Sequence, residues 1–226
     1  MKTMKPFIAE FTGTALLLAI IASSAVLIGD MFADGSVAVV RLGNGIATGA
    51  GLYVLIVLFG PFSGAHFNPV VSVMFWRMGQ ISLPRMLGYW VAQFSGGIFG
   101  VWLTHCMFDL PVIQTSTTAR AGTGMWVSEL ISALILLSVI RLGDKYNKQS
   151  LPTLVALIVA TGAWFTPSTF FANPAVTVAR SLTDTFVGIS PESAFWFVTA
   201  EFFAVFLISM SLPKQGSVFQ ENRMTG

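Results

Sequence analysis

The sequence has little charge and few groups that could carry out chemistry. Only 10% of its 226 residues are Asp, Glu, Lys or Arg, against roughly 25% in average soluble domains. Cys106 is the only cysteine, which excludes an internal disulfide. The two histidines, His66 and His105, lack a local carboxylate partner, and no nucleotide or cofactor motif is present. We therefore expect no enzyme, no cofactor and no bound metal.

Basic clusters are missing as well. The net charge is +2, and no run of Lys and Arg is interleaved with aromatic residues. Nucleic-acid-binding domains normally show such a patch. We therefore expect no nucleic-acid partner.

Long apolar stretches dominate what is present. The chain is 54% hydrophobic, with a mean hydropathy of +0.77. A helix that crosses a bilayer needs about 20 mostly apolar residues. Six stretches meet or approach this length: 7–29, 38–60, 86–107, 125–142, 151–166 and 194–212. The composition predicts one all-α membrane domain with six transmembrane helices.

The distribution of Lys and Arg predicts the orientation in the membrane. With six spans, both termini and the even-numbered loops share one side. That side carries nine basic residues and the other carries three, namely Arg41, Arg120 and Arg180. The positive-inside rule then places both termini in the cytoplasm, in a plasma membrane, with the bacterial inner membrane as the specific expectation.

Two Asn-Pro pairs, one in each half, mark abrupt helix starts inside this apolar chain. They open the runs NPVVSV from Asn68 and NPAVTV from Asn173. Asn is a favoured N-cap, and Pro69 and Pro174 suit the first helical position. Helices from 68 to about 77 and from 173 to about 182 would be ~15 Å long, half of a ~30 Å hydrocarbon core. Each is predicted to be a re-entrant half-helix, and the two N-termini are expected to meet at mid-membrane.

Further matches indicate an inverted repeat of about 1–118 and 119–212. Glu10 in Ala-Glu-Phe corresponds to Glu129 in Ser-Glu-Leu. Gln93 in Val-Ala-Gln-Phe corresponds to Glu201 in Thr-Ala-Glu-Phe. Three spans in each half would insert the two halves in opposite directions. Residues 213–226 are predicted to form a short cytoplasmic tail.

These motifs resemble those of the aquaporin and aquaglyceroporin family, the major intrinsic proteins, over nearly the whole chain. The run 63–70, Ser-Gly-Ala-His-Phe-Asn-Pro-Val, is similar to the first family signature, with Val70 where Ala is usual. Asn173, Pro174 and Ala175 match the second signature. The resemblance implies six spans with two re-entrant half-helices, a passive channel, and a homotetramer in which each subunit has its own pore.

The paired helix starts suggest how such a pore would select its solutes. Each helix N-terminus carries roughly +0.5 charge, which disfavours cations at the pore centre. The side-chain amides of Asn68 and Asn173 could donate hydrogen bonds to a passing oxygen while their caps restrain them. Water and small neutral solutes would pass as the protein replaces part of their hydration shell.

Other residues receive roles from the resemblance. It implies that Glu10 and Glu129 accept hydrogen bonds from the re-entrant segments and hold them, and that His66 lines the pore. Glu201 receives no firm role. As an ionisable residue within a span, it keeps open the alternative of a coupled secondary transporter.

The selectivity filter departs from the family pattern. An Arg usually follows the second Asn-Pro-Ala, whereas Val176 stands here. Arg180 lies one turn further toward the outer mouth, where we expect a vestibule residue paired with Asp184 at i, i+4. Distances along the chain assign the other filter positions to Thr48, Thr161 and Phe170.

A filter of this composition predicts a wide, amphipathic and uncharged constriction. It favours glycerol, urea and neutral metalloid hydroxides such as arsenous acid over water alone. Related bacterial channels with Val at this place resemble metalloid-permeable members. Two alternatives stay open besides the transporter: a water-selective aquaporin and a non-conducting structural member.

Overall fold

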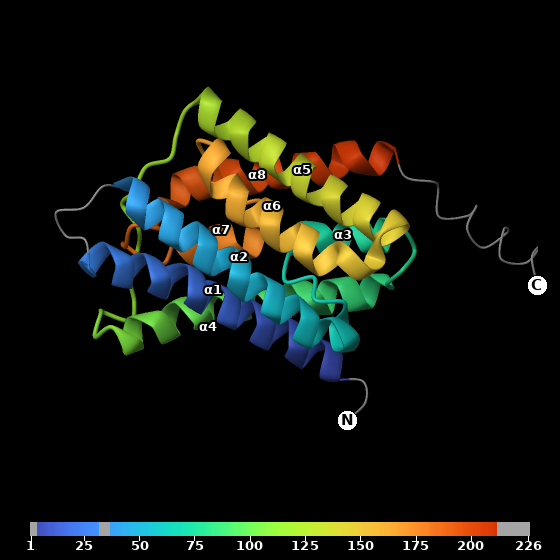
Figure 1. Cartoon of the computed structure of the whole chain (residues 1–226), viewed down its shortest axis with the longest axis horizontal. Helices are drawn as coiled ribbons and strands as arrows, with labels where there is room; N and C mark the ends of the chain where they lie inside the picture. Colours follow the sequence, from blue (N-terminus) through green and yellow to red (C-terminus); the bar gives the residue numbers. More distant parts are fainter. Residues whose placement is uncertain (1–3, 32–36, 212–226) are drawn as a thin grey trace, which may run out of the picture.

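The chain folds into a bundle of long helices that enclose two short ones (Figure 1). The computed structural model describes residues 4–31 and 37–211, and these contain helices and no strands. The predicted tail, 213–226, lies outside the described residues. The six predicted spans correspond to the following helices: α1 (Lys5–Met31), α2 (Val37–Ser63), α4 (Leu83–Met107), α5 (Thr123–Tyr146), α6 (Leu151–Phe165) and α8 (Pro191–Met210).

Four of these helices, α1, α2, α5 and α8, are long and apolar enough to cross a membrane by length and composition. The helix α6 has only 15 residues. It follows the 3₁₀ turn η1 (Lys148–Ser150) and ends where the chain enters the second re-entrant segment. The predicted all-α membrane fold is thus confirmed for the described residues.

The two predicted half-helices are α3 (Pro69–Arg77) and α7 (Pro174–Arg180). Both lie inside the bundle, one toward each end of its long axis (Figure 1). The order of elements, two long helices, a half-helix and a long helix, is the same in both halves of the chain. The packing also corresponds, because α1 contacts α2 and α4 as α5 contacts α6 and α8. Contacts of α2 with α6, α4 with α7 and α3 with α8 join the halves.

Each half-helix starts at its asparagine for the same local reason. Asn68 and Asn173 have extended backbones, and their side-chain oxygens accept hydrogen bonds from the N–H groups of Val70 and Ala175, respectively. These bonds satisfy donors that a helix N-terminus otherwise leaves without partners. A proline occupies the first turn of both helices, as the sequence predicts.

The segments before the two asparagines share an unusual backbone. Three residues in each have positive φ, and they match pairwise: Gly64 with Thr169, Ala65 with Phe170, and Phe67 with Ala172. Each pair is separated by 105 residues, as Asn68 and Asn173 are (173 − 68). A non-glycine residue in this region costs about 1–2 kcal/mol, so neighbouring groups must hold these segments in place.

Glycines let α4 approach α1 at backbone distance. A Cβ atom at Gly100 would lie 2.1 Å from the carbonyl oxygen of Ala15, and one at Gly96 would lie 2.4 Å from that of Phe11. Backbone atoms in helices cannot move aside as a side chain does. Small residues at this spacing therefore fix the separation of the two helices, as is common in membrane bundles.

We predict that Gly100→Ala lowers the apparent melting temperature of the purified protein in detergent, because α1 and α4 must move apart. Overpacking of this kind costs about 1–3 kcal/mol. Gly29→Ala in α1 is the matched control, since nothing lies within 4 Å of the Cβ position there. Differential scanning fluorimetry of both variants would measure the difference. Equal melting temperatures would contradict the close backbone contact.

Candidate functional site: a cavity around paired asparagines

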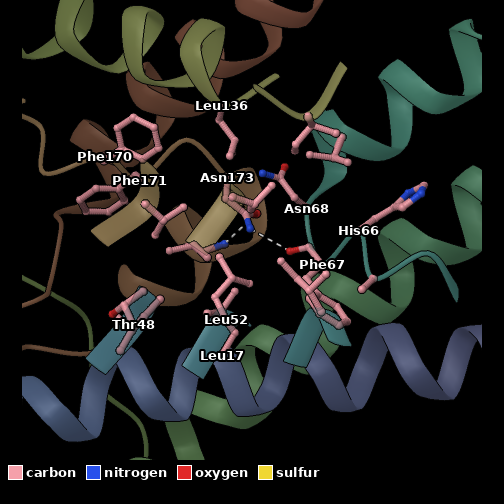
Figure 2. Close-up of a pocket in the computed structure, with 18 of the residues that line it drawn as sticks. Leu17, Thr48, Leu52, His66, Phe67, Asn68, Leu136, Phe170, Phe171 and Asn173 are labelled. Atoms are coloured by element: carbon pink, nitrogen blue, oxygen red, sulfur yellow. Dashed lines mark hydrogen bonds between the residues drawn. The ribbon is translucent and has the colours of Figure 1, made fainter. Parts of the chain in front are cut away.

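A cavity of about 120 Å³ lies inside the bundle and is lined by Asn68 and Asn173. Thr48, Phe170 and Phe171 lie toward one end of it, His66 lies at the other, and the two asparagines lie between (Figure 2). Leucine, isoleucine and valine side chains line most of the wall between these polar positions. The cavity therefore extends to both sides of the point where the half-helices begin.

The two asparagines tie the re-entrant segments to each other. The Nδ2 of Asn68 donates a hydrogen bond of 2.7 Å to the carbonyl oxygen of Ala172. The Nδ2 of Asn173 donates one of 2.8 Å to the carbonyl oxygen of Phe67 (Figure 2). Each amide thus bonds to the residue just before the other asparagine, and the sequence did not predict this reciprocal pair.

The geometry leaves each amide with one donor for a solute. The Oδ1 atoms cap α3 and α7, and one N–H of each NH₂ group bonds to the opposite segment. An amide carries two N–H donors. Because both side chains line the cavity, the second N–H of each is available to an oxygen inside it.

Glu10 holds the first re-entrant segment. Its carboxylate accepts backbone hydrogen bonds from His66 at 2.9 Å and from Phe67 at 2.7 Å. Gln93 on α4 donates its amide to the same carboxylate at 2.8 Å and to the hydroxyl of Ser72 in α3 at 3.0 Å. One buried carboxyl group thus joins α1, α4 and the segment before Asn68.

Glu129 and Glu201 hold the second segment in a similar way. The backbone N–H of Ala172 donates to Glu129, and that of Asn173 donates to Glu201 at 3.0 Å. Glu201 also accepts a hydrogen bond of 2.7 Å from the hydroxyl of Thr177 in α7. The sequence match of Gln93 with Glu201 was the signal that could have assigned Glu201 this role.

One difference separates the two halves. Gln93 can donate an N–H to Glu10, whereas Glu201 meets Glu129 as a second carboxyl group. Both glutamates are fully buried. Among the described residues, no N–H or hydroxyl group donates a hydrogen bond to the Oε2 atom of either, and the two carboxyl groups interact with each other.

Three of the four expected filter residues line the cavity: Thr48, Phe170 and Val176. The hydroxyl oxygen of Thr48 is buried and has no hydrogen-bond partner among the described residues. A buried polar atom without a protein partner normally bonds to water or a ligand. The hydroxyl of Thr48 is therefore a further contact for a solute.

The assignment of Thr161 needs correction. Val159 and Ala163 of α6 line the cavity, and Thr161 does not. Thr161 lies two residues from each, which places it about 200° around the helix axis. Its side chain is exposed, and its hydroxyl donates to the carbonyl oxygen of Leu157 at 2.8 Å.

The expected pairing of Arg180 with Asp184 is also wrong. The helix α7 ends at Arg180, so Asp184 is not on the same helix. Asp184 instead accepts hydrogen bonds from the N–H and hydroxyl of Thr117. Arg180 is buried, and it lines the cavity around the asparagines together with Val176. Positions i and i+4 share one face of a helix, so the spacing of Val176 and Arg180 could have predicted that both line the same cavity.

His66 lines the opposite end of the cavity. It also packs against protein groups, because its ring stacks on Phe75 with centroids 4.6 Å apart and meets Tyr89 edge-on. Its Nδ1 lies 3.1 Å from the hydroxyl oxygen of Ser72. His66 therefore combines a lining position with a fixed side chain.

Long apolar helices around two opposed half-helices, with a cavity through the junction, define a membrane channel. Comparison with known proteins gives the family. Residues 1–209 match the family model described as "Major intrinsic protein". The chain belongs to this family, and it is a channel and not an enzyme.

Several known proteins are similar to the chain. Aquaglyceroporin AqpS of Rhizobium meliloti is 44% identical over 194 residues, which cover 86% of this chain and 82% of that protein. Lens fiber major intrinsic protein of Gallus gallus is 30% identical over 164 residues, covering 65% and 62%. The X-ray structure of the aquaglyceroporin from Plasmodium falciparum matches with a TM-score of 0.68 at 21% identity, over 92% of this chain and 94% of that chain. The structural match supports the fold.

We predict that Glu201→Gln raises the apparent melting temperature, because an amide in this place would donate to Glu129 as Gln93 donates to Glu10. A hydrogen bond to a charged group contributes about 1.5–3 kcal/mol. Gln93→Glu is the reciprocal control and should lower the melting temperature by placing a second carboxyl group beside Glu10. The account is contradicted if Glu201→Gln destabilises the protein as much as Gln93→Glu does.

Proposed function

We propose that this protein is a passive channel for water and small uncharged solutes, with Asn68 and Asn173 as the central hydrogen-bond donors. The observation that carries the proposal is the pair of half-helix N-termini that meet at the cavity. Both amides are restrained and still present a free N–H. The positive ends of both helices point to the same place and disfavour cations there.

The lining favours neutral polar solutes. It contains no Asp or Glu among the described residues, and its polar groups are spaced along an otherwise apolar wall. A solute such as glycerol can place its hydroxyl groups against Asn68, Asn173 and Thr48 and its carbon chain against Phe170 and Val176. A largely apolar pocket with a few placed polar groups is typical of small-molecule sites.

The substrate class extends to glycerol, urea and neutral metalloid hydroxides such as arsenous acid. Two similar proteins support the solute-conducting reading over a water-selective one. One is the aquaglyceroporin of Rhizobium meliloti. The other is the probable glycerol uptake facilitator of Thermotoga maritima, 27% identical over 173 residues, which cover 69% of this chain and 72% of that protein. Val176 provides room that an arginine would fill.

The transporter alternative depended on Glu201, and the geometry gives it no support. Glu201 accepts hydrogen bonds from the backbone of Asn173 and the hydroxyl of Thr177, interacts with Glu129, and does not line the cavity. A coupled transporter normally places an ionisable group in the solute path. Glu201 serves here as a scaffold.

The proposal includes the arrangement in the membrane. Both termini lie in the cytoplasm of a cell whose plasma membrane holds the channel, because basic residues concentrate on that side. The two halves, about 1–118 and 119–212, are inverted repeats. Apolar side chains exposed on the long helices, such as Leu58 and Phe206, face lipid. A homotetramer is the assembly that membership in the family implies.

Stopped-flow light scattering on liposomes that contain the purified protein tests the function. Shrinkage in an impermeant osmolyte reports water flow, and reswelling in glycerol or urea reports solute flow. We expect both to exceed those of empty liposomes. Fast water flow without solute entry would support a water-selective channel, and no acceleration of either would support the non-conducting alternative.

We predict that Val176→Arg reduces glycerol and urea flux about tenfold, a change of about 1.4 kcal/mol in the barrier. The guanidinium would occupy the space beside Phe170 and narrow the path. Val176→Thr is the matched control, because it keeps the shape of valine and should leave solute flux high. Reswelling rates, normalised to protein content, measure both variants. An unchanged glycerol flux in Val176→Arg would contradict the assignment of Val176 to the constriction.

A further inference from the structure

Three arginines converge at the end of the pore where α7 ends. A small cavity of about 40 Å³ lies there, lined by Arg41 of α2, Arg120 of the α4–α5 connection and Arg180. It shares Asn44, Ala163, Thr169 and Arg180 with the cavity around the asparagines, so the two cavities are neighbours. Each of these arginines comes from a different part of the chain.

Arg180 is fixed in place. Its Nε donates a hydrogen bond of 2.5 Å to the carbonyl oxygen of Val187. The central carbon of the guanidinium lies over the ring of Phe171, 3.5 Å from its centroid. A cation over an aromatic face is stabilised by the ring, and the guanidinium has N–H donors besides the one at Nε. Arg180 is 6% exposed and lines both cavities.

Arg120 and Arg41 add to the charge at this end. Arg120 donates to the carbonyl oxygens of Gly188 and Phe186, at 2.9 and 3.3 Å. It also lies 5.3 Å from the centroid of Phe171, the ring on which Arg180 stacks. Burial, with a contribution from Arg41, lowers the pKa of Arg120 to about 10, so the group stays charged at neutral pH. The Nε of Arg41 is buried and has no hydrogen-bond partner among the described residues.

No carboxylate of the described residues forms an ion pair with this cluster. Within residues 4–31 and 37–211 the only ion pair joins Lys148 to Asp144, neither of which lines these cavities. Glu129 acts on Arg120 and Arg180 through space, but it forms no ion pair with either and bonds to Ala172. Backbone carbonyl oxygens accept hydrogen bonds from Arg120 and Arg180, but they carry no full negative charge. The electrostatic potential at the entrance therefore stays positive.

We propose that Arg180, supported by Arg120 and Arg41, forms the cation barrier of this pore and acts one helical turn outside Val176. A guanidinium at this level repels protons and metal cations in a partly desolvated space, where charges are weakly screened. Its free N–H groups bond to the oxygens of neutral solutes.

The inference rests on the proposed channel function. It assigns selection by size and selection by charge to two separate positions along the pore. Val176 and Phe170 set the width of the path, and Arg180 sets its charge selectivity further out. A channel built in this way can admit bulky neutral solutes at Val176 without losing the charge barrier. In a filter with arginine beside the second signature, one residue would perform both tasks.

Proteoliposomes with an entrapped pH-sensitive dye test the barrier. A potassium diffusion potential drives protons inward, and light scattering on the same vesicles measures water flow. Two variants change Arg180: Arg180→Gln removes the charge and Arg180→Lys retains it. A third, Arg41→Glu, reverses a charge at the entrance. Because the Nε of Arg41 has no hydrogen-bond partner among the described residues, this change breaks no hydrogen bond of that atom. The ratio of proton to water permeability corrects for protein content and for closed pores.

We expect the ratio to rise about tenfold in Arg180→Gln, equivalent to about 1.4 kcal/mol, and to stay within about twofold of the original protein in Arg180→Lys. Arg41→Glu should raise it about threefold, and it decides the question if Arg180→Gln does not fold. Unchanged ratios in variants that still conduct water would overturn the inference and leave the helix dipoles at the asparagines as the whole barrier. Absence of water flow through the original protein would instead contradict the proposed function.

Discussion

The reciprocal hydrogen bonds between the two re-entrant segments are the constraint on which the rest of the structure depends. Asn68 reaches the carbonyl oxygen of Ala172, and Asn173 reaches that of Phe67. The N-termini of α3 and α7 carry positive partial charges and would otherwise repel each other. Positive φ angles at Phe67 and Ala172 add a conformational cost on both sides. The paired amides offset these costs directly at the pore.

The scaffold carboxyl groups make this arrangement possible, and the pore function follows from it. Glu10 fixes the segment before Asn68, while Glu129 and Glu201 fix the one before Asn173. All three are away from the cavity lining, so the anchors add no acidic group to the solute path. A path with restrained N–H donors, apolar walls and arginines at one mouth suits neutral polar solutes and disfavours cations.

The sequence predicted most of the fold because its strongest signals are local. Pro69 and Pro174 fix helix starts through their own backbone geometry, and apolar length fixes the spans. It was harder to predict which side chains of the long helices face the cavity, because this depends on how each helix is rotated about its axis. Counting along the chain placed Thr161 in the filter, but a step of two residues from Val159 turns it away from the cavity. The expected pairing of Arg180 with Asp184 failed because α7 ends before Asp184. The bond of Asn173 to Glu201 was not predicted because it joins residues on separate elements.

A double-mutant cycle tests most directly whether the two asparagines act as one unit. Apparent stabilities of Asn68→Ala, Asn173→Ala and the double variant would be measured under identical detergent conditions. We predict that the double variant costs at least about 1 kcal/mol less than the sum of the single ones, because each change already loosens both segments. A cycle of Asn68 with Asn147, which caps the distant turn η1, should be additive. Additive costs for Asn68 and Asn173 would contradict the interlocked pore centre.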